Sequence, residues 1–240
     1  MDLFYAEHLR ENDSEIALSA EESHHCRHVM RKRVGDRISL TNGKGFRAEA
    51  IIRLFRGAGA TCEILSGTIV PPPRSRRILA ALSPIRPRRM DWAVEKLTEL
   101  GVGKIIPVLC EHSSVGLIKK KHLNKIAVSA LKQSGQFYLP EIGEPRLLTD
   151  WLDNLPPGGN TLRLIAHPVA AGFITEPGNF QTGIVLTGPE GGFTEAEVNR
   201  AREHCFRPIR LSHSILRSET ASVAGAFLLL SIFNGTHFKL

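Results

Sequence analysis

The sequence lacks the long apolar segments that a membrane protein needs. No run approaches the roughly 18 consecutive apolar residues of a transmembrane helix. The opening stretch MDLFYAEHLRENDSE is acidic, whereas a secretory signal is basic and then apolar. We therefore expect a cytoplasmic protein that has no membrane partner.

Cysteine is also scarce, and its spacing argues against a fold held together by disulfides or by a metal. The four cysteines lie far apart and form no C-x-x-C pair: Cys26, Cys62, Cys110 and Cys205. This excludes a disulfide framework or a zinc ribbon as the basis of the fold. His24, His25 and His28 beside Cys26 resemble a metal cluster, but neighbouring residues of a helix point apart and no distant pair completes a tetrahedral set. We expect no metal.

Basic residues are distributed unevenly along the 240-residue chain, which carries a formal net charge of +7. Residues 1–73 hold ten basic and ten acidic side chains, so the whole excess lies beyond residue 73. Six arginines and no acid occur within residues 73–89, and nine Lys or Arg face two acids within residues 27–56. Both basic runs are candidates for phosphate contacts, with solvated faces as the alternative.

Three prolines at residues 71–73 mark a domain boundary, because they cannot enter a helix interior or a sheet ladder. We divide the chain into residues 1–73 and 74–240. The first part has short β-type segments and a helical stretch around residues 21–31, which indicates a small β-barrel-like domain with one helix. The second alternates strands and helices, which predicts an α/β domain with a mostly parallel sheet covered on both faces.

Two strand-to-helix loops in the second part carry the chemical signal. The first, GIVLTGPEGGFTEAEV, ends an apolar strand in a loop with three glycines, where backbone can approach a ligand closely. Thr194 and Glu197 form a capping box for the next helix. The loop lacks the G-x-x-x-x-G-K-[ST] and G-x-G-x-x-G spacings, which disfavours phosphate or dinucleotide binding. A tight turn without a ligand is the alternative.

The second loop lies in RLSHSILRSETASVAG and leads into the apolar C-terminal helix. Ser218 is the expected N-cap, and Glu219 in the first turn would favour the helix dipole. Arg217 precedes the cap and is expected to point into the same cleft as the first loop. Two polar loops at strand ends of one sheet predict a small-molecule site.

The two loops closely resemble the paired motifs of the RsmE family, the 16S ribosomal RNA uracil-N3 methyltransferases of the SPOUT class. The resemblance rests on GPEGGFTEAEV and ILRSETA, and continues through RMDWAVEKLTELGVGKIIPVLCEHSS, KQSGQFYLPEI and HHCRHVMRKRVGDRISLTNGKG. It covers nearly the whole chain. It implies an N-terminal PUA-like barrel that holds RNA, a C-terminal trefoil-knotted α/β domain, a homodimer, S-adenosylmethionine as cofactor and 16S rRNA or the small ribosomal subunit as partner.

The resemblance also assigns residues. The cofactor-binding residues it implies are Ala166, His167, Pro168, Thr187, Gly188, Pro189, Glu190, Gly191, Gly192, Leu211, Ser212, Ile215 and Leu216. Arg217 is the candidate for stabilising the uracil anion, with a salt bridge to Glu190 or Glu219 as its alternative role. Glu219 is a weaker candidate for general base. The RNA-binding candidates are Arg27, Arg31, Lys32, Arg33, Arg86, Arg88 and Arg89.

The sequence departs from the family pattern at two places. Ser212, His213 and Ser214 stand where a glycine and often an arginine are expected, and Lys132 and Gln136 stand where an acid and an arginine are common. A pure RNA-binding module would explain the basic runs but not the two loops. A metabolic enzyme that binds an adenine nucleotide would explain the loops but not the arginines.

One aromatic residue has two possible roles. Trp92 could stack on a base, but its helical spacing with Leu97 and Leu100 favours packing in the protein core.

Overall fold

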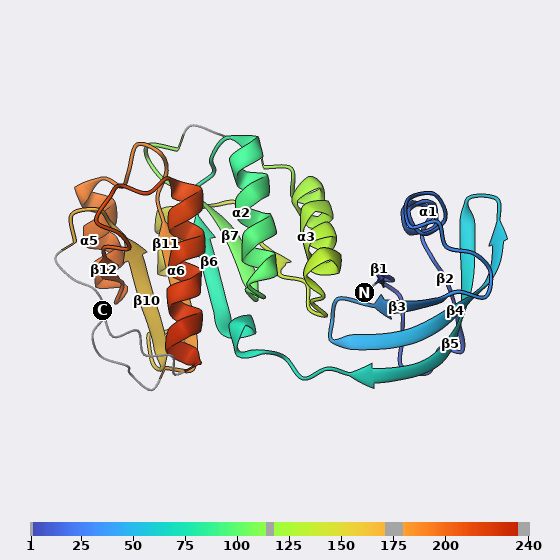
Figure 1. Cartoon of the computed structure of the whole chain (residues 1–240). Coiled ribbons are helices and arrows are strands. Elements are labelled where there is room, and N and C mark those ends of the chain that lie inside the picture. The colour runs from blue at the N-terminus through green and yellow to red at the C-terminus, as the bar shows by residue number, and fades with distance from the viewer. Residues whose placement is uncertain (1, 114–117, 171–179, 235–240) are drawn as a thin grey trace. The chain divides into compact units, whose positions relative to one another are not determined.

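The computed structural model describes residues 2–113, 118–170 and 180–234 (Figure 1). The chain divides into two compact units. The first joins Met1–Pro72 with Val128–Leu139, and the second joins Pro73–Ala127 with Pro140–Leu240. The single division after residue 73 remains a prediction, and a short later segment of the chain joins the first unit.

The first unit is built on a five-stranded sheet in the order β1-β3-β4-β5-β2. Only β1 and β3 pair in parallel, and the other pairs are antiparallel. Along β4 every second side chain from Phe46 to Ile52 is buried, as alternation of apolar and polar residues predicts. The strands are β1 (Leu3–Tyr5), β2 (Glu15–Ala17), β3 (Arg37–Thr41), β4 (Phe46–Arg56) and β5 (Gly59–Ile69).

The predicted helix near residues 21–31 is present and changes its winding along its length. It begins as α1 (Ala20–His24), where the Ser19 hydroxyl accepts a hydrogen bond from the Glu22 amide. It continues as a π-helical turn, η1 (His25–Val29). Cys26 on this turn is buried in the core of the first unit.

Residues 128–139 belong to the first unit through specific polar contacts. They include the end of α3 (Lys120–Ser134) and the residues after it. Lys132 forms an ion pair with the buried Glu22, and the Tyr138 hydroxyl donates a hydrogen bond of 2.6 Å to the Val70 carbonyl. The Lys132 departure from the family pattern therefore supplies the counter-charge to a buried acid.

The second unit contains a parallel sheet in the order β12-β10-β11-β6-β7-β8, with β9 paired to β7. This is the mostly parallel sheet that the alternation of strands and helices predicts. Its strands are β6 (Ile78–Leu82), β7 (Lys104–Leu109), β8 (Glu141–Ile142), β9 (Arg146–Leu147), β10 (Thr161–Ala166), β11 (Thr182–Thr187) and β12 (Arg207–Ile209).

Helices cover both faces of this sheet. On one face α6 packs against α2, β6 and β11 (Figure 1), and on the other α4 and α5 pack together over the strands. A Cβ atom on Gly225 of α6 would lie 2.4 Å from Cγ2 of Val185, so the absence of a side chain allows this close approach. The helices are α2 (Pro87–Glu99), α4 (Leu148–Asp153), α5 (Glu195–Glu203) and α6 (Ser218–Phe233), preceded by a 3-10 turn, η2 (Arg74–Arg77).

The helix α2 buries one face and leaves Trp92 partly exposed. The buried face of α2 is formed by Met90, Ala93, Val94 and Leu97, while Trp92 is 39% exposed. Within the described ranges no helix is long and apolar enough to cross a membrane.

Candidate active site

A cavity of about 570 Å³ lies where β10, β11 and β12 end, at the carboxyl edge of the parallel sheet. Open α/β sheets commonly bind ligands at this edge. Every residue predicted to bind the cofactor lines this cavity: Ala166, His167, Pro168, Thr187, Gly188, Pro189, Glu190, Gly191, Gly192, Leu211, Ser212, Ile215 and Leu216. Three loops separated in sequence thus meet around one space.

Packing and backbone conformation, as well as the cavity, favour glycine in the first loop. Gly192 has a φ of 76°, in the left-handed region that favours glycine. A Cβ on Gly188 would lie 2.9 Å from the ring of Phe193, and one on Gly191 would lie 3.0 Å from Cβ of His112. Close approach of bare backbone to a ligand is therefore not the only reason for glycine here.

The predicted capping box at the start of α5 is confirmed. The Thr194 hydroxyl accepts from the Glu197 amide, and the Glu197 carboxylate accepts from the Thr194 amide at 2.9 Å. The second Glu197 oxygen also accepts from the Glu111 amide. The capping residues thereby tie the first loop to the turn that follows β7.

That turn contributes a residue to which we assigned no role from the sequence. His112 lies in the quoted segment CEHSS, and its Nδ1 is 3.2 Å from the Gly192 carbonyl oxygen. The Ser113 hydroxyl accepts a hydrogen bond from the Cys110 amide and lies 2.7 Å from the Ser83 hydroxyl. The His112 contact thus joins the glycine loop to the turn after β7, and the Ser113 bonds hold that turn in place.

Arg89, whose predicted contact with RNA stays a prediction, lies in the lining of this cavity. Its guanidinium pairs with Glu190 of the first loop, and its Nε is 3.6 Å from Glu219 at the start of α6. One cation from α2 thus connects the acids of both loops. No sequence pattern indicated this pairing, because the arginine lies within a basic run.

The start of α6 differs from the prediction by one residue. The helix begins at Ser218, and Arg217 is its N-cap with extended backbone and no side-chain cap bond. The N-cap assignment to Ser218 is therefore wrong. Arg217 lines the cavity and is exposed, and no carboxylate among the described residues pairs with it. The acids that were its alternative partners contact Arg89.

Three buried oxygens near the cavity have no hydrogen-bond partner in the described part of the chain: Thr187 Oγ1, Glu219 Oε2 and Ser222 Oγ. Buried polar atoms are usually satisfied by protein, water or ligand. Thr187 is itself in the cavity lining, and its hydroxyl oxygen is buried. The combination of apolar side chains and backbone groups in the lining suits a nucleoside-containing cofactor.

The remaining predicted RNA-binding residues occupy two regions. In the first unit Arg27 stacks 5.4 Å above the Phe55 ring, Lys32 pairs with Asp2, and the Arg33 amide donates to Asp36. Arg31 adopts a positive φ of 55°. In the second unit two exposed arginines lie at the start of α2: Arg86 is its N-cap, and Arg88 is in its first turn. His24 and His28 stack at 4.8 Å, and among the described residues no set of three potential ligands could hold a metal.

Comparison with known proteins assigns both units. Residues 72–230 match the family model of the RNA methyltransferase domain, and residues 18–53 match that of the RNA methyltransferase PUA domain. The fold and the cavity therefore define an RNA methyltransferase with a PUA domain.

Individual relatives specify the family. A probable rRNA-methyltransferase from Porphyromonas gingivalis is 31% identical with a TM-score of 0.86, over 99% of this chain and all of that one. The ribosomal RNA small subunit methyltransferase E of Neisseria gonorrhoeae, bound to S-adenosyl methionine, is 29% identical with a TM-score of 0.85, over 97% and 98%. The Buchnera aphidicola (Schizaphis graminum) protein of the same name is 26% identical over 92% of each chain.

The chain belongs to the RsmE family of ribosomal RNA small subunit methyltransferases. This confirms the expected fold class, a SPOUT-type α/β methyltransferase domain preceded by a PUA domain.

Proposed function

We propose that the protein transfers a methyl group from S-adenosylmethionine to N3 of a uridine in 16S ribosomal RNA. The observation that carries this proposal is the convergence of three loops, from the ends of β10, β11 and β12, on one cavity at the carboxyl edge of the sheet. Membership of the RsmE family supports the cofactor and the RNA class, and ribosomal RNA as substrate supports a cytoplasmic location.

The cavity residues would hold the cofactor in complementary ways. Leu211, Ile215 and Leu216 offer apolar side chains for a nucleoside, and the backbone of residues 188–192 offers amides and carbonyls. The buried Thr187 hydroxyl offers one further hydrogen bond. When bound, S-adenosylmethionine supplies an electrophilic methyl group on a sulfonium. Methyl transfer from a sulfonium to a nitrogen needs no metal in this scheme.

Arg217 is the proposed catalytic cation. Uracil N3 is a poor nucleophile until its proton leaves, so a cation near O2 or O4 stabilises the anion that develops. Arg217 suits this role because it lines the cavity and its guanidinium is not held by a carboxylate of the described residues. Glu219 has Arg89 as a partner, which favours a positioning role for this acid over that of general base.

The partner subunit would complete the site. Val169 and Ile215 line the cavity, yet they are 82% and 86% exposed. Large apolar side chains so exposed at a binding site are typical of surfaces that another protein covers. A homodimer in which the second copy packs over these residues would bury them. Sedimentation that shows only a species of 26.5 kDa at micromolar concentration would contradict the dimer.

The test of the proposed function is site mapping. The protein is added back to a strain that lacks small-subunit uridine-N3 methylation, and modified positions are mapped by primer extension, since a methyl on N3 blocks the pairing edge. Restoration of one stop that depends on S-adenosylmethionine binding is expected. Arg217→Lys should lower the single-turnover rate roughly ten- to a thousandfold while both affinities change little. No stop with the wild-type protein would refute the proposed function.

A further inference from the structure

A second cavity, of about 470 Å³, lies at the opposite edge of the sheet, where β10 and β12 begin. Among the residues that the structure describes, the lining includes three arginines and no acid. Its lining residues come from the turn before β10, the end of α5 and the start of β12, so the cavity is separate from the cofactor loops at the carboxyl edge. Nothing in the proposed reaction uses it.

Arg163 on β10 supplies the charge at the base of this cavity. It is only 3% exposed. One terminal nitrogen donates 2.9 Å to the His204 carbonyl oxygen and the other donates to the Pro156 carbonyl, while Nε is buried without a partner in the described residues. Two carbonyl dipoles orient this cation but do not neutralise it. A buried charge without a counter-ion is costly, so an anion at this site would be stabilised.

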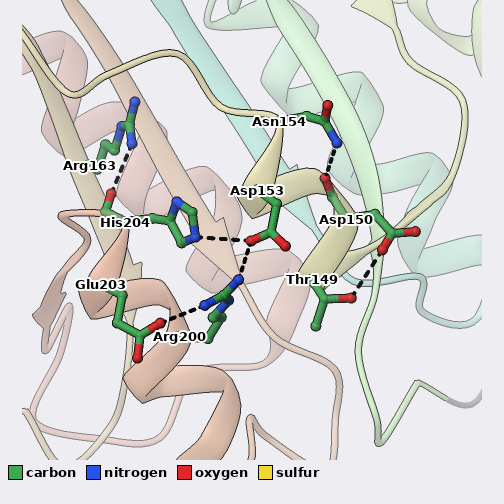
Figure 2. A network of polar contacts seen from close by, with 8 residues as sticks. All are labelled: Thr149, Asp150, Asp153, Asn154, Arg163, Arg200, Glu203 and His204. Atoms are coloured by element: carbon green, nitrogen blue, oxygen red, sulfur yellow. Dashed lines mark hydrogen bonds and ion pairs between the residues drawn. The ribbon is translucent and has the colours of Figure 1, made fainter.

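Two nearby acids, Asp153 and Glu203, are already engaged by another arginine, Arg200, as Figure 2 shows. Asp153 pairs with Arg200 at 2.6 Å and lies 3.1 Å from the His204 ring. Glu203 pairs with the same Arg200 at 2.8 Å. Neither acid contacts Arg163, which Figure 2 shows directed to the His204 carbonyl.

The two remaining arginines sit at the rim. Arg202 and Arg207 are exposed, and no described carboxylate pairs with either. The only bond of the Arg202 guanidinium within the described residues joins it to the Asn199 amide oxygen, at 3.0 Å. Guanidinium groups present planar pairs of donors that match phosphate oxygens. Two such exposed groups beside the buried charge of Arg163, with no acid among the described lining residues, favour phosphate over a singly charged carboxylate.

We propose that this cavity binds a backbone phosphate of the RNA substrate, a site distinct from both the cofactor cavity and the basic runs noted in the sequence. The inference rests on the proposed function, because RNA is the ligand. Arg202 and Arg207 would contact the phosphate directly. Arg163 would act from beneath as a fixed charge.

The test compares charge removals at matched positions in the full-length protein. Binding of a 16S rRNA fragment is measured by fluorescence anisotropy over a range of salt concentrations. Arg202→Gln and Arg207→Gln should each lower the slope of log affinity against log salt by about 0.7, the value for one single-strand phosphate contact. Arg200→Gln is the control, since it removes an equal charge from the same helix as Arg202 but from a guanidinium that two acids already hold.

The outcomes separate this inference from its competitors. Slope changes confined to Arg202 and Arg207 support it, and slopes that are unchanged, or equally changed by Arg200→Gln, overturn it. Calorimetry also tests whether inorganic pyrophosphate binds the wild type but not Arg207→Gln. If it does, and the salt slopes for RNA binding are the same in the variants and the wild type, the cavity binds a free phosphate compound and the RNA proposal is wrong. Cofactor affinity and wild-type methylation, measured in parallel, report on the proposed function independently.

Discussion

Replacing Arg89 with glutamine should loosen the cofactor site without unfolding the protein. Arg89 connects Glu190, in the glycine loop, with Glu219, in the first turn of α6. The glutamine keeps much of the length of the side chain but removes the charge. Both acids then lose the cation that they share, and the glycine loop loses its link to the helix.

The size of the effect follows from the geometry. For the 3.6 Å contact with Glu219, Coulomb's law with an effective dielectric constant of about 20 gives roughly 4 to 5 kcal/mol. The side chain of Arg89 is 29% exposed and that of Glu219 is 10% exposed, so water screens part of this energy. A net loss of about 1 to 3 kcal/mol remains. If about 1 to 2 kcal/mol of it reappears as the cost of ordering the loop on binding, cofactor affinity falls about 5- to 30-fold.

Isothermal calorimetry with S-adenosylmethionine measures the affinity, and urea unfolding measures stability. Arg88→Gln is the matched control, because Arg88 is the preceding residue of α2, is exposed and makes no ion pair among the described residues. The control should bind the cofactor normally. Equal cofactor affinity in Arg89→Gln and wild type, or an equal loss in Arg88→Gln, would refute the positioning role.

Three further outcomes are expected. Gly191→Val should displace His112, whose Cβ would lie 3.0 Å from the new Cβ, and calorimetry should show cofactor affinity lowered at least about tenfold. In Gly192→Ala the new Cβ meets no atom within 4 Å but the backbone keeps a φ of 76°, so the change should cost only about 1 kcal/mol of backbone strain. The hydrogen bond from Lys32 lowers the pKa of Asp2 below its usual 3.8, so the Asp2–Lys32 pair stabilises the fold above pH 3.8 and loses this effect as the pH falls through the folded-state pKa. Asp2→Asn should therefore reduce the free energy of unfolding at neutral pH. If the reduction persists unchanged in strong acid, the pair is not its cause. Burial raises the pKa of Cys26 to about 11 and of Cys62 and Cys110 to about 12, whereas Cys205 is exposed, so a thiol reagent at about pH 8 should modify Cys205 first and the others only on unfolding.

Much of the secondary structure was predictable because its signals are local. Alternation along β4, the parallel-type apolar strands β10 and β11, and the Thr194 capping box depend on residues that are neighbours in sequence. The order of strand, loop and helix also predicted two polar loops at one edge of the sheet, since parallel strands all end at the same side, and both loops line the cavity there.

Local sequence signals gave wrong predictions where neighbouring positions could fill the same structural role. Ser218 is a good N-cap residue by type, yet the helix starts with it and Arg217 is the cap, because a boundary shift of one residue changes little in local propensity. Trp92 has helical spacing with Leu97, but the buried face of α2 runs through Met90, Ala93, Val94 and Leu97, leaving the indole partly outside.

The amino-acid order alone thus specifies the kinds of elements and their sequence along the chain. The pairing of charges is a matter of tertiary structure. Arg89 and Glu190 are 101 residues apart, and Lys132 and Glu22 are 110 apart. A charged side chain has several possible partners of opposite sign, and Coulomb attraction selects among them by distance and burial, which exist only after the sheet and its helices have packed. For the same reason Arg163, one arginine among many in the sequence, becomes a buried cation only in the folded sheet.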